Sequence, residues 1–380
     1  MEKMEQFYAP IRVIMGSDAL VTALEGRKKV FVVTDPYMAE SGRVTYVTEL
    51  VRNLGGESSV FSECHADPDT EIVSRGVSQL TAFGPDALVA FGGGSSIDAA
   101  KAMRYFAIHN CGLTSCPFIA IPTTSGTGSE VTDYAVITDA AKAIKYPMTA
   151  PELLPDIAIL DAALVSSVPL NVTANTGMDV LTHAIEAYTT KTRNDFTDAM
   201  AEKSIELVYH YLLKVYHDPE NLEYRQRMHN ASTLAGMAFS NSGLGLVHGM
   251  AHALGATFHI PHGGACGLML PYVMHFNAGC STSLTPTAHR YAMIANTLGI
   301  GSQSIRQSAL IVIRTIRQAE EKMRMPTSIQ KAGISEAEFY TALESLAEKA
   351  HNDPCTASNL QPATMEEIKD IYEKAYYGKY

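Results

Sequence analysis

The stretch that decides the fold is ALVAFGGGSSIDAAK, residues 87–101. It opens with a continuous apolar run, which is typical of a strand buried in a parallel sheet. Glycines follow and lead directly into a helical pattern, where Ser95 or Ser96 is expected to cap the helix. Glycine lets a phosphate approach the backbone, and the free N–H groups of a helix N-terminus attract it. The stretch therefore indicates a phosphate-binding turn. Because it has neither GxGxxG nor Walker A spacing, a tight turn without a ligand is the alternative.

The residues on either side continue this alternation of strand and helix. Apolar runs at Lys29–Thr34, Phe118–Ile121 and Ile157–Leu160 predict further strands, with helical patterns between them. Beyond Pro169 the chain reads as helix after helix, without a comparable strand run. We therefore expect an α/β domain with a mostly parallel sheet over residues 1–168, followed by an all-helical domain over residues 169–380.

The composition is that of a large acidic globular protein. The chain has 380 residues, 46% of them hydrophobic, and its 29 basic and 40 acidic residues give a net charge of −11. These values exclude a disordered or fibrous protein and make nucleic acid an unexpected partner. No apolar stretch reaches the roughly 18 residues that a membrane span needs, and no targeting signal is recognisable. The six cysteines form no CxxC pair, so we expect reduced thiols in a cytoplasmic protein.

Two further strand ends carry polar groups. Asp35 follows the strand predicted at Lys29–Thr34, where a carboxylate can bind a ribose 2′-hydroxyl and repel a 2′-phosphate. The same residue precedes Pro36 and could equally cap a helix. The segment TTSGTGSE, residues 123–130, follows another strand and is rich in hydroxyl groups and glycine. Its groups could surround a phosphate, a ribose or an amide.

Histidines concentrate in one segment of the helical half. Five of the 13 histidines lie in a short window that includes HGMAHALGATFHIPHGG. His248 and His252 are four residues apart on one helix face, and Asp179 and His183 repeat this spacing. Together with His262 these groups could surround a divalent ion, whereas an isolated histidine is usually a packed or surface residue. Spacing alone pairs His248 with His252 as ligands and does not separate ligand from catalyst.

Four motifs in order along nearly the whole chain resemble the iron-containing (group III) alcohol dehydrogenases. The motifs are GGGSSIDAAK, IPTTSGTGSEVT, ANTGMDVLTHAIEAYT and GLGLVHGMAHALGATFHIPHG. The resemblance implies the fold shared with dehydroquinate synthase, in which an α/β dinucleotide-binding domain precedes a helical metal-binding domain. Within the family, the segments most similar to the 1-propanol dehydrogenases of propanediol-utilising bacteria are IKYP, NTGMDVLTHA, DFTDAMAEK and MHNASTLAGMAFS.

The resemblance assigns roles to residues that match the family's motifs. The implied metal ligands are Asp179, His183, His248 and His262. The implied active-site histidine beside the nicotinamide is His252, which replaces the ligand role that spacing alone suggests. The implied cofactor contacts are Asp35, Gly93, Gly94, Ser95, Thr123, Thr124, Thr127, Thr132 and Lys145. The positions implied to face the substrate are Tyr134 and Phe239. The segment GGACG after His262 varies in the family, so the role of Cys266 stays open.

The implied activity is hydride transfer between NAD(H) and a short-chain alcohol or aldehyde, with the reduction of an aldehyde by NADH as the expected direction. A divalent ion, usually Fe²⁺ in the family with Zn²⁺ or Mn²⁺ as alternatives, would polarise the carbonyl group. We expect both halves of the site to meet in a cleft between the two domains. Propionaldehyde, acetaldehyde, lactaldehyde and sulfoacetaldehyde are all candidate substrates. A carbon–oxygen lyase on the same fold is disfavoured by the Asp-His-His-His pattern.

The expected partners are few. Many apolar helix faces and the family resemblance predict a homo-oligomer, a dimer or larger. The similarity to enzymes of propanediol-utilising bacteria also suggests that the protein could be enclosed in a bacterial microcompartment within the cytoplasm. Neither a nucleic acid nor a membrane is expected as a partner.

Overall fold

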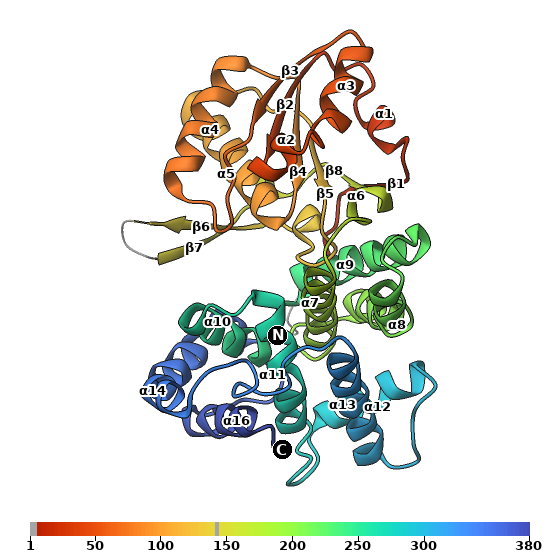
Figure 1. The fold of residues 1–380 in the computed structure, drawn as a ribbon, viewed down its shortest axis with the longest axis vertical. Helices are drawn as coiled ribbons and strands as arrows, with labels where there is room; N and C mark the ends of the chain where they lie inside the picture. The colour runs from red at the N-terminus through yellow and green to blue at the C-terminus, as the bar shows by residue number, and fades with distance from the viewer. Residues whose placement is uncertain (1–5, 141–143) are drawn as a thin grey trace. The chain divides into compact units, whose positions relative to one another are not determined.

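The computed structural model describes residues 6–140 and 144–380, and the chain divides into two units (Figure 1). The sheet unit comprises residues 8–166, and the helical unit comprises residues 167–380 together with residues 6–7. The predicted fold class is confirmed, because a parallel sheet with helices in the first unit precedes a second unit whose described elements are all helices.

The sheet unit is built on parallel strands in the order β1-β8-β5-β4-β2-β3. These strands are β1 (Arg12–Met15), β2 (Lys29–Thr34), β3 (Glu57–Phe61), β4 (Ala87–Gly92), β5 (Phe118–Pro122) and β8 (Ile157–Leu160). A separate antiparallel hairpin is formed by β6 (Tyr134–Asp139) and β7 (Ile144–Thr149). The helices are α1 (Ala19–Ala23), α2 (Pro36–Glu40), α3 (Thr45–Asn53), α4 (Thr70–Phe83), α5 (Gly94–Cys111) and α6 (Ala162–Val165).

Helices cover both faces of this sheet. Successive residues of a strand point to opposite faces, and in β2 both sets are buried. Phe31 and Val33 belong to a core that they share with α4 and α5. Val30 and Val32 belong to a second core, shared with α1 and α3. This two-sided burial explains why the central strands read as continuous apolar runs, and why they could be predicted from sequence.

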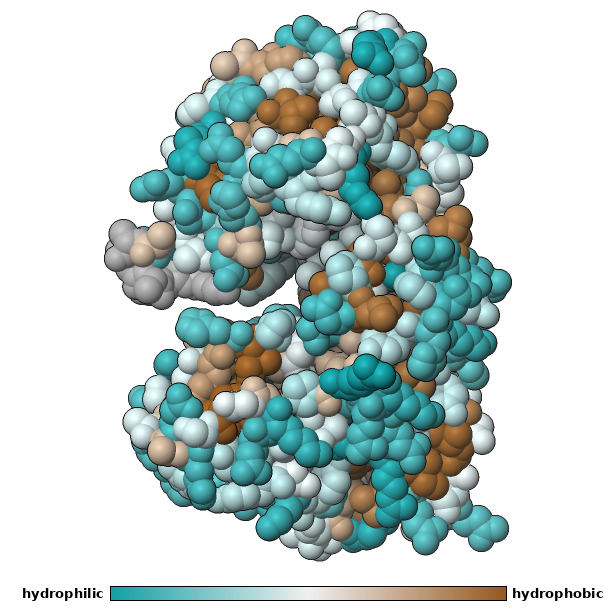
Figure 2. Space-filling model, viewed as in Figure 1, coloured by the Kyte–Doolittle hydropathy of each residue, from teal (hydrophilic) through white to brown (hydrophobic). Residues whose placement is uncertain are grey.

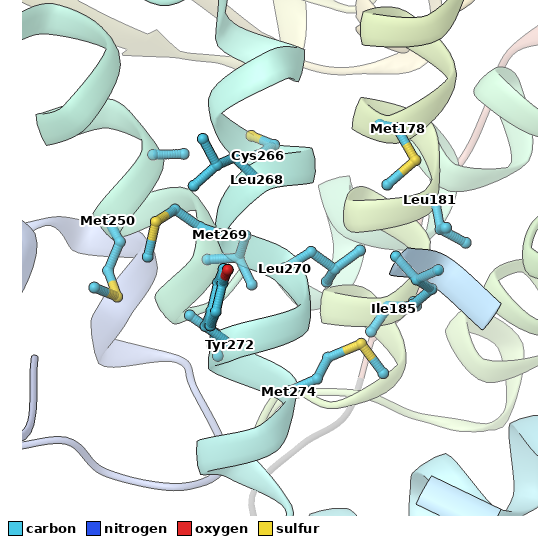
Figure 3. Packing of buried hydrophobic residues seen from close by; sticks show 14 of the residues in the cluster. Met178, Leu181, Ile185, Met250, Cys266, Leu268, Met269, Leu270, Tyr272 and Met274 are labelled. Atoms are coloured by element: carbon cyan, nitrogen blue, oxygen red, sulfur yellow. The ribbon is translucent and has the colours of Figure 1, made fainter. Parts of the chain in front are cut away.

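The helical unit has one large core. Its helices are α7 (Leu170–Tyr188), α8 (Asp195–His217), α9 (Leu222–Ser242), α10 (Leu246–Phe258), α11 (His262–Asn277), α12 (Pro286–Thr297), α13 (Ile305–Lys322), α14 (Glu336–Asn352), α15 (Pro354–Ala357) and α16 (Met365–Tyr377). The C-terminal two-thirds of α7 is buried at every position. Figure 3 shows Met178 and Ile185 of this helix in the same packed interior as Leu270 and Met274 of α11.

Helix α11 combines a predicted metal ligand with residues that disfavour a helix. His262 is the first residue of α11, and Pro271 lies inside the helix. A Cβ atom at Gly263 would lie 2.2 Å from the backbone oxygen of Asn175, and one at Gly267 would lie 3.0 Å from Cβ of Met178. The glycines therefore allow α11 to pack closely on α7. They also weaken the helical signal in the sequence.

Strands β1 and β3 and the hairpin were not predicted. Their burial is partial, so they lack the continuous apolar run that marks a central strand. The face in Figure 2 carries mainly hydrophilic residues with scattered hydrophobic ones. Among the described residues, no helix is both long and apolar enough to cross a membrane.

Candidate active site

The predicted cofactor residues of the sheet unit come together at one edge of the sheet. Strands β2, β4 and β5 are parallel neighbours that end in register. The residues that follow them are Asp35 after β2, Gly93 and Gly94 after β4, and Thr123 and Thr124 after β5. Strand β3 lies on one side of β2 and the next strand, β4, on the other, so the strand order reverses there. Ligands of open α/β sheets bind at such a reversal, beyond the carboxyl ends of the strands.

The N-terminus of α5 is open to an anion. Gly93 occupies the N-cap position, and among the described residues no side chain caps this helix. The predicted cap by Ser95 or Ser96 is wrong, because the helix begins at Gly94 and both serines lie within its first turn. A Cβ atom at Gly94 would lie 2.8 Å from Cγ2 of Thr127, so this turn packs tightly on the threonine-rich loop. Because no described side chain caps this helix, the backbone N–H groups of its first turn can bind a phosphate.

Of the two roles predicted for Asp35, helix cap and ribose contact, the structure shows the first and does not test the second. Its Oδ1 accepts a 2.9 Å hydrogen bond from the backbone N–H of Met38, so it caps α2. A Cβ atom at Gly92 would lie 3.2 Å from Oδ2, so the second oxygen faces the glycine turn. The cap is confirmed, and the binding of a ribose stays a prediction.

A buried lysine anchors the threonine-rich loop. Lys101 is fully buried, and its Nζ donates to Ser129 Oγ at 3.0 Å, to Thr132 Oγ1 at 3.0 Å and to the backbone oxygen of Tyr134 at 2.7 Å. Burial lowers the pKa of Lys101 to about 8, although the nearby carboxylate of Asp98 favours the charged form and opposes this shift. Lys101 was not predicted from the sequence, although its spacing of three residues from Asp98 on α5 was a signal. The hydroxyl of Thr132 is buried in this anchor, and its role as a cofactor contact stays a prediction.

The remaining predicted residues of the sheet unit lie nearer the surface. Thr127 is exposed, and its Oγ1 accepts the N–H of Ser129 at 3.3 Å. Tyr134 begins β6 and is 42% exposed. Lys145 lies on β7 opposite Thr138, but its side chain is outside the described part of the structure.

The four predicted metal ligands converge in the helical unit. Helix α7 supplies Asp179 and His183, α10 supplies His248, and α11 supplies His262. From Oδ1 of Asp179, the Nε2 atoms lie 3.9 Å away for His183, 3.9 Å for His248 and 3.4 Å for His262. Donor atoms that bind one tetrahedral ion at about 2.1 Å lie about 3.4 Å apart. These separations from Asp179 fit a single ion after small movements, with His183 further from the group, because the donors that all lie within 4.8 Å of one another are those of Asp179, His248, His262 and Cys266.

The chemistry of the cluster also fits a cation. Oδ1 of Asp179 and Nε2 of His248 are buried, and neither atom has a hydrogen-bond partner among the described residues. Burial raises the pKa of Asp179, because the carboxylate loses its hydration and the neighbouring His183 and Cys266 compensate only in part. Burial also lowers the pKa of His248 well below its ordinary value, so its imidazole is neutral and able to ligate. A divalent ion would satisfy both atoms.

Glu186 holds His248 in place and was not predicted. It lies on α7 and is buried, and its Oε2 is 2.6 Å from Nδ1 of His248. Its carboxylate also accepts the backbone N–H groups of Gly245 at 2.9 Å and Val247 at 2.6 Å, where α10 begins. A hydrogen bond at Nδ1 fixes the tautomer that directs the lone pair of Nε2 towards an ion. The spacing of seven residues from Asp179 places Glu186 on the same helix face, which is a signal that sequence could have offered.

His252 lies beside the cluster and has a carboxylate partner of its own. Its Nδ1 is 2.9 Å from Oδ2 of Asp353, and its ring stacks on that of His262 with centroids 5.4 Å apart. Burial opposes ionisation of Asp353, but the hydrogen bond from His252 holds its pKa below the usual value. The side chain of His252 is 43% exposed. Asp353 was missed, because no local pattern links it to a residue about a hundred positions away.

Two further side chains border the cluster. The ring of Phe239, on α9, stacks on His183 with centroids 4.5 Å apart, so this predicted substrate-facing residue lies next to a predicted ligand. Cys266 is buried on α11, with Sγ 3.7 Å from Nε2 of His262. Burial raises its pKa well above the ordinary value.

Family models match both units. The model of iron-containing alcohol dehydrogenase matches residues 10–162, and that of the C-terminal part of the Fe-containing alcohol dehydrogenase family matches residues 173–376. The NADPH-dependent butanol dehydrogenase of Clostridium saccharobutylicum is 39% identical, over 99% of this chain and 99% of its own. The 1-propanol dehydrogenase PduQ of Salmonella typhimurium is 40% identical, over 98% of this chain and 100% of its own.

A solved structure agrees with these relatives. The iron-containing alcohol dehydrogenase of Thermococcus thioreducens superposes with a TM-score of 0.87 and 36% identity, over 98% of this chain and 100% of its own. The resemblance inferred from the sequence motifs is thus confirmed, including the similarity to 1-propanol dehydrogenases. The chain belongs to the iron-containing alcohol dehydrogenase family, whose members are metal-dependent oxidoreductases of alcohols and aldehydes.

Proposed function

We propose that this enzyme reduces a short-chain aldehyde with NADH, using Fe²⁺ held by Asp179, His183, His248 and His262. The observation that carries the proposal is the convergence of three imidazole Nε2 atoms on one buried carboxylate oxygen. One carboxylate and three neutral imidazoles leave a divalent ion with net positive charge. When bound, the ion supplies a Lewis acid for the carbonyl oxygen, and the nicotinamide supplies the hydride.

Other residues of the chain would position a metal ligand and supply the proton for the product oxygen. Glu186 holds the imidazole of His248 in the ligating tautomer. Nδ1–H of His252 donates a hydrogen bond to the carboxylate of Asp353, which orients the ring and leaves Nε2 as the atom that would exchange a proton with the product oxygen.

The proposed cofactor site lies at the strand ends of the sheet unit. The open N-terminus of α5 would bind the pyrophosphate through the backbone around Gly93, Gly94 and Ser95. Oδ2 of Asp35 faces the same turn, so this oxygen would accept a hydrogen bond from a ribose hydroxyl. Its negative charge would repel a 2′-phosphate. This argument favours NADH, although one relative is named for its use of NADPH.

The proposed substrate is small and apolar. Phe239 presents a ring against the imidazole of His183, which gives the cluster an apolar wall. Such a wall favours propionaldehyde or butyraldehyde over lactaldehyde or sulfoacetaldehyde. The names of the butanol and 1-propanol dehydrogenases support the same class of substrate.

The test is an aldehyde panel assayed by the loss of NADH and NADPH absorbance, with enzyme that is metal-free, Fe²⁺-loaded or treated with a chelator. We expect the highest kcat/KM with propionaldehyde or butyraldehyde and NADH, loss of activity with the chelator, and recovery with Fe²⁺. Full activity in the metal-free enzyme would contradict the metal proposal. A preference for sulfoacetaldehyde would contradict the substrate proposal alone.

Assembly and location also stay proposals. We expect a homo-oligomer, which light scattering at micromolar concentration tests, since a monomer mass would overturn it. Enclosure in a cytoplasmic microcompartment is tested by co-purification of the enzyme with isolated shells.

A further inference from the structure

Cys266 places a soft donor inside the proposed metal cluster. Donor atoms of Asp179, His248, His262 and Cys266 all lie within 4.8 Å of one another. The thiol is fully buried, and its Sγ lies 3.7 Å from Nε2 of His262. In a tetrahedral zinc site with bonds of about 2.3 Å to sulfur and 2.0–2.1 Å to nitrogen, these atoms lie about 3.6 Å apart. The spacing is that of two ligands of one ion.

The packing of α11 on α7 fixes this position. His262 and Cys266 are four residues apart, so they lie on one face of α11. Gly263 and Gly267, which follow each of them, approach α7 so closely that a Cβ atom would meet Asn175 at 2.2 Å and Met178 at 3.0 Å. Because the helices cannot separate without losing this contact, the thiol is held beside the cluster. Figure 3 shows Cys266 on α11 in the same interior as Met178.

Two other atoms of the group also point to a cation. Oδ1 of Asp179 and Nε2 of His248 are buried and, within the described chain, have no hydrogen-bond partner. Their residues are 3% and 1% exposed. The thiol therefore belongs to a group of donors that already points to a cation, and it is not an isolated cysteine.

We propose that Cys266 is a ligand of the metal ion and makes the site selective for thiophilic ions such as Zn²⁺ and Co²⁺ over Mn²⁺. This inference rests on the proposed function, since it concerns the ion of the same site. On coordination the S–H bond breaks, the proton leaves to solvent, and the sulfur lone pair forms the bond to the ion. Thiolate ligands favour Zn²⁺, whereas carboxylate ligands and water suit Mn²⁺. His183, whose Nε2 is 3.9 Å from Asp179 Oδ1, completes a set of five donors.

The experiment uses the full-length enzyme after removal of its metal and reconstitution with Co²⁺ in the presence of a reductant. In the wild type we expect one bound Co²⁺ and a near-ultraviolet charge-transfer band from thiolate to cobalt. In Cys266→Ser, which keeps the size of the side chain, we expect the band to disappear while Co²⁺ still binds. The affinity for Zn²⁺ should fall at least about tenfold in this variant, with little change for Mn²⁺. Cys280→Ser, which removes another cysteine just after α11, is the matched control and should keep the band.

A measurement without any variant supports or overturns the same inference. X-ray absorption at the zinc edge of the Zn²⁺-loaded wild type should show one sulfur atom at about 2.3 Å beside nitrogen and oxygen atoms at 2.0–2.2 Å. Stoichiometric metal with only nitrogen and oxygen neighbours, and a Co²⁺ spectrum equal to that of Cys266→Ser, would overturn the role of Cys266 and leave the proposed function intact. Failure of the wild type to bind any divalent ion would overturn both.

Discussion

Replacing Glu186 by glutamine should weaken metal binding although Glu186 is not a proposed ligand. Its two oxygens accept three hydrogen bonds, from the N–H groups of Gly245 and Val247 and from Nδ1 of His248. In Glu186→Gln one of these oxygens becomes an NH₂ group, so at least one buried donor faces another donor. An unsatisfied buried donor costs about 1–3 kcal/mol of stability. An NH₂ group at Nδ1 would also favour the tautomer of His248 that carries its proton on Nε2, and this tautomer does not ligate.

The expected loss of metal affinity in Glu186→Gln is about 10- to 100-fold, the usual cost of losing a partner that orients a ligand. This corresponds to roughly 1.4–2.8 kcal/mol. The assay is competition for Zn²⁺ with a chelator of known affinity, read as the metal dissociation constant. Glu320→Gln is the matched control, because Glu320 is also a fully buried carboxylate of the helical unit but bonds to Arg317 of α13. An unchanged dissociation constant in Glu186→Gln, or an equal weakening in the control, would refute the reasoning.

Three further predictions concern the cofactor turn and the packing of α11. Asp35→Asn keeps a good helix cap while removing the charge, so the ratio of kcat/KM for NADPH to that for NADH should rise at least about tenfold, and an unchanged ratio would remove Asp35 from cofactor selection. Lys101→Met should destabilise the sheet unit by about 3–5 kcal/mol, measured by thermal unfolding. It should also weaken NADH binding, measured by cofactor titration, and a normal NADH affinity would contradict the anchoring role of Lys101. Gly263→Ala places a Cβ atom 2.2 Å from a backbone oxygen of α7 and should lower both the melting temperature and the metal content. Gly264→Ala meets only the end of a side chain, at 3.1 Å, and should change both much less.

The sequence predicts those parts of the fold and site that depend on local spacing. Central strands buried on both faces read as apolar runs, so β2, β4, β5 and β8 could be placed within a residue or two. The pair Asp179 and His183 is four residues apart on one helix, and this geometry holds wherever the helix packs.

The parts that depend on tertiary packing could not be predicted in this way. Helix α11 contains Gly263, Gly267 and Pro271, which lower helix propensity, and only contact with α7 explains why the segment is helical. The partnership of His252 with Asp353 joins residues about a hundred positions apart. The choice of ligands among three neighbouring histidines came from family resemblance, because spacing alone favours His252.

Metal analysis of His252→Ala and His262→Ala, after equal dialysis against a chelator, tests the central claim most directly. The claim is that Asp179, His183, His248 and His262 bind the ion, while His252 acts beside it. We predict that His252→Ala keeps near-stoichiometric metal and binds NADH, yet loses about 10²–10⁴-fold in turnover. His262→Ala should retain its fold but keep far less metal than His252→Ala under the same dialysis, and lose its activity. A metal-depleted His252→Ala beside a metal-loaded His262→Ala would contradict the account.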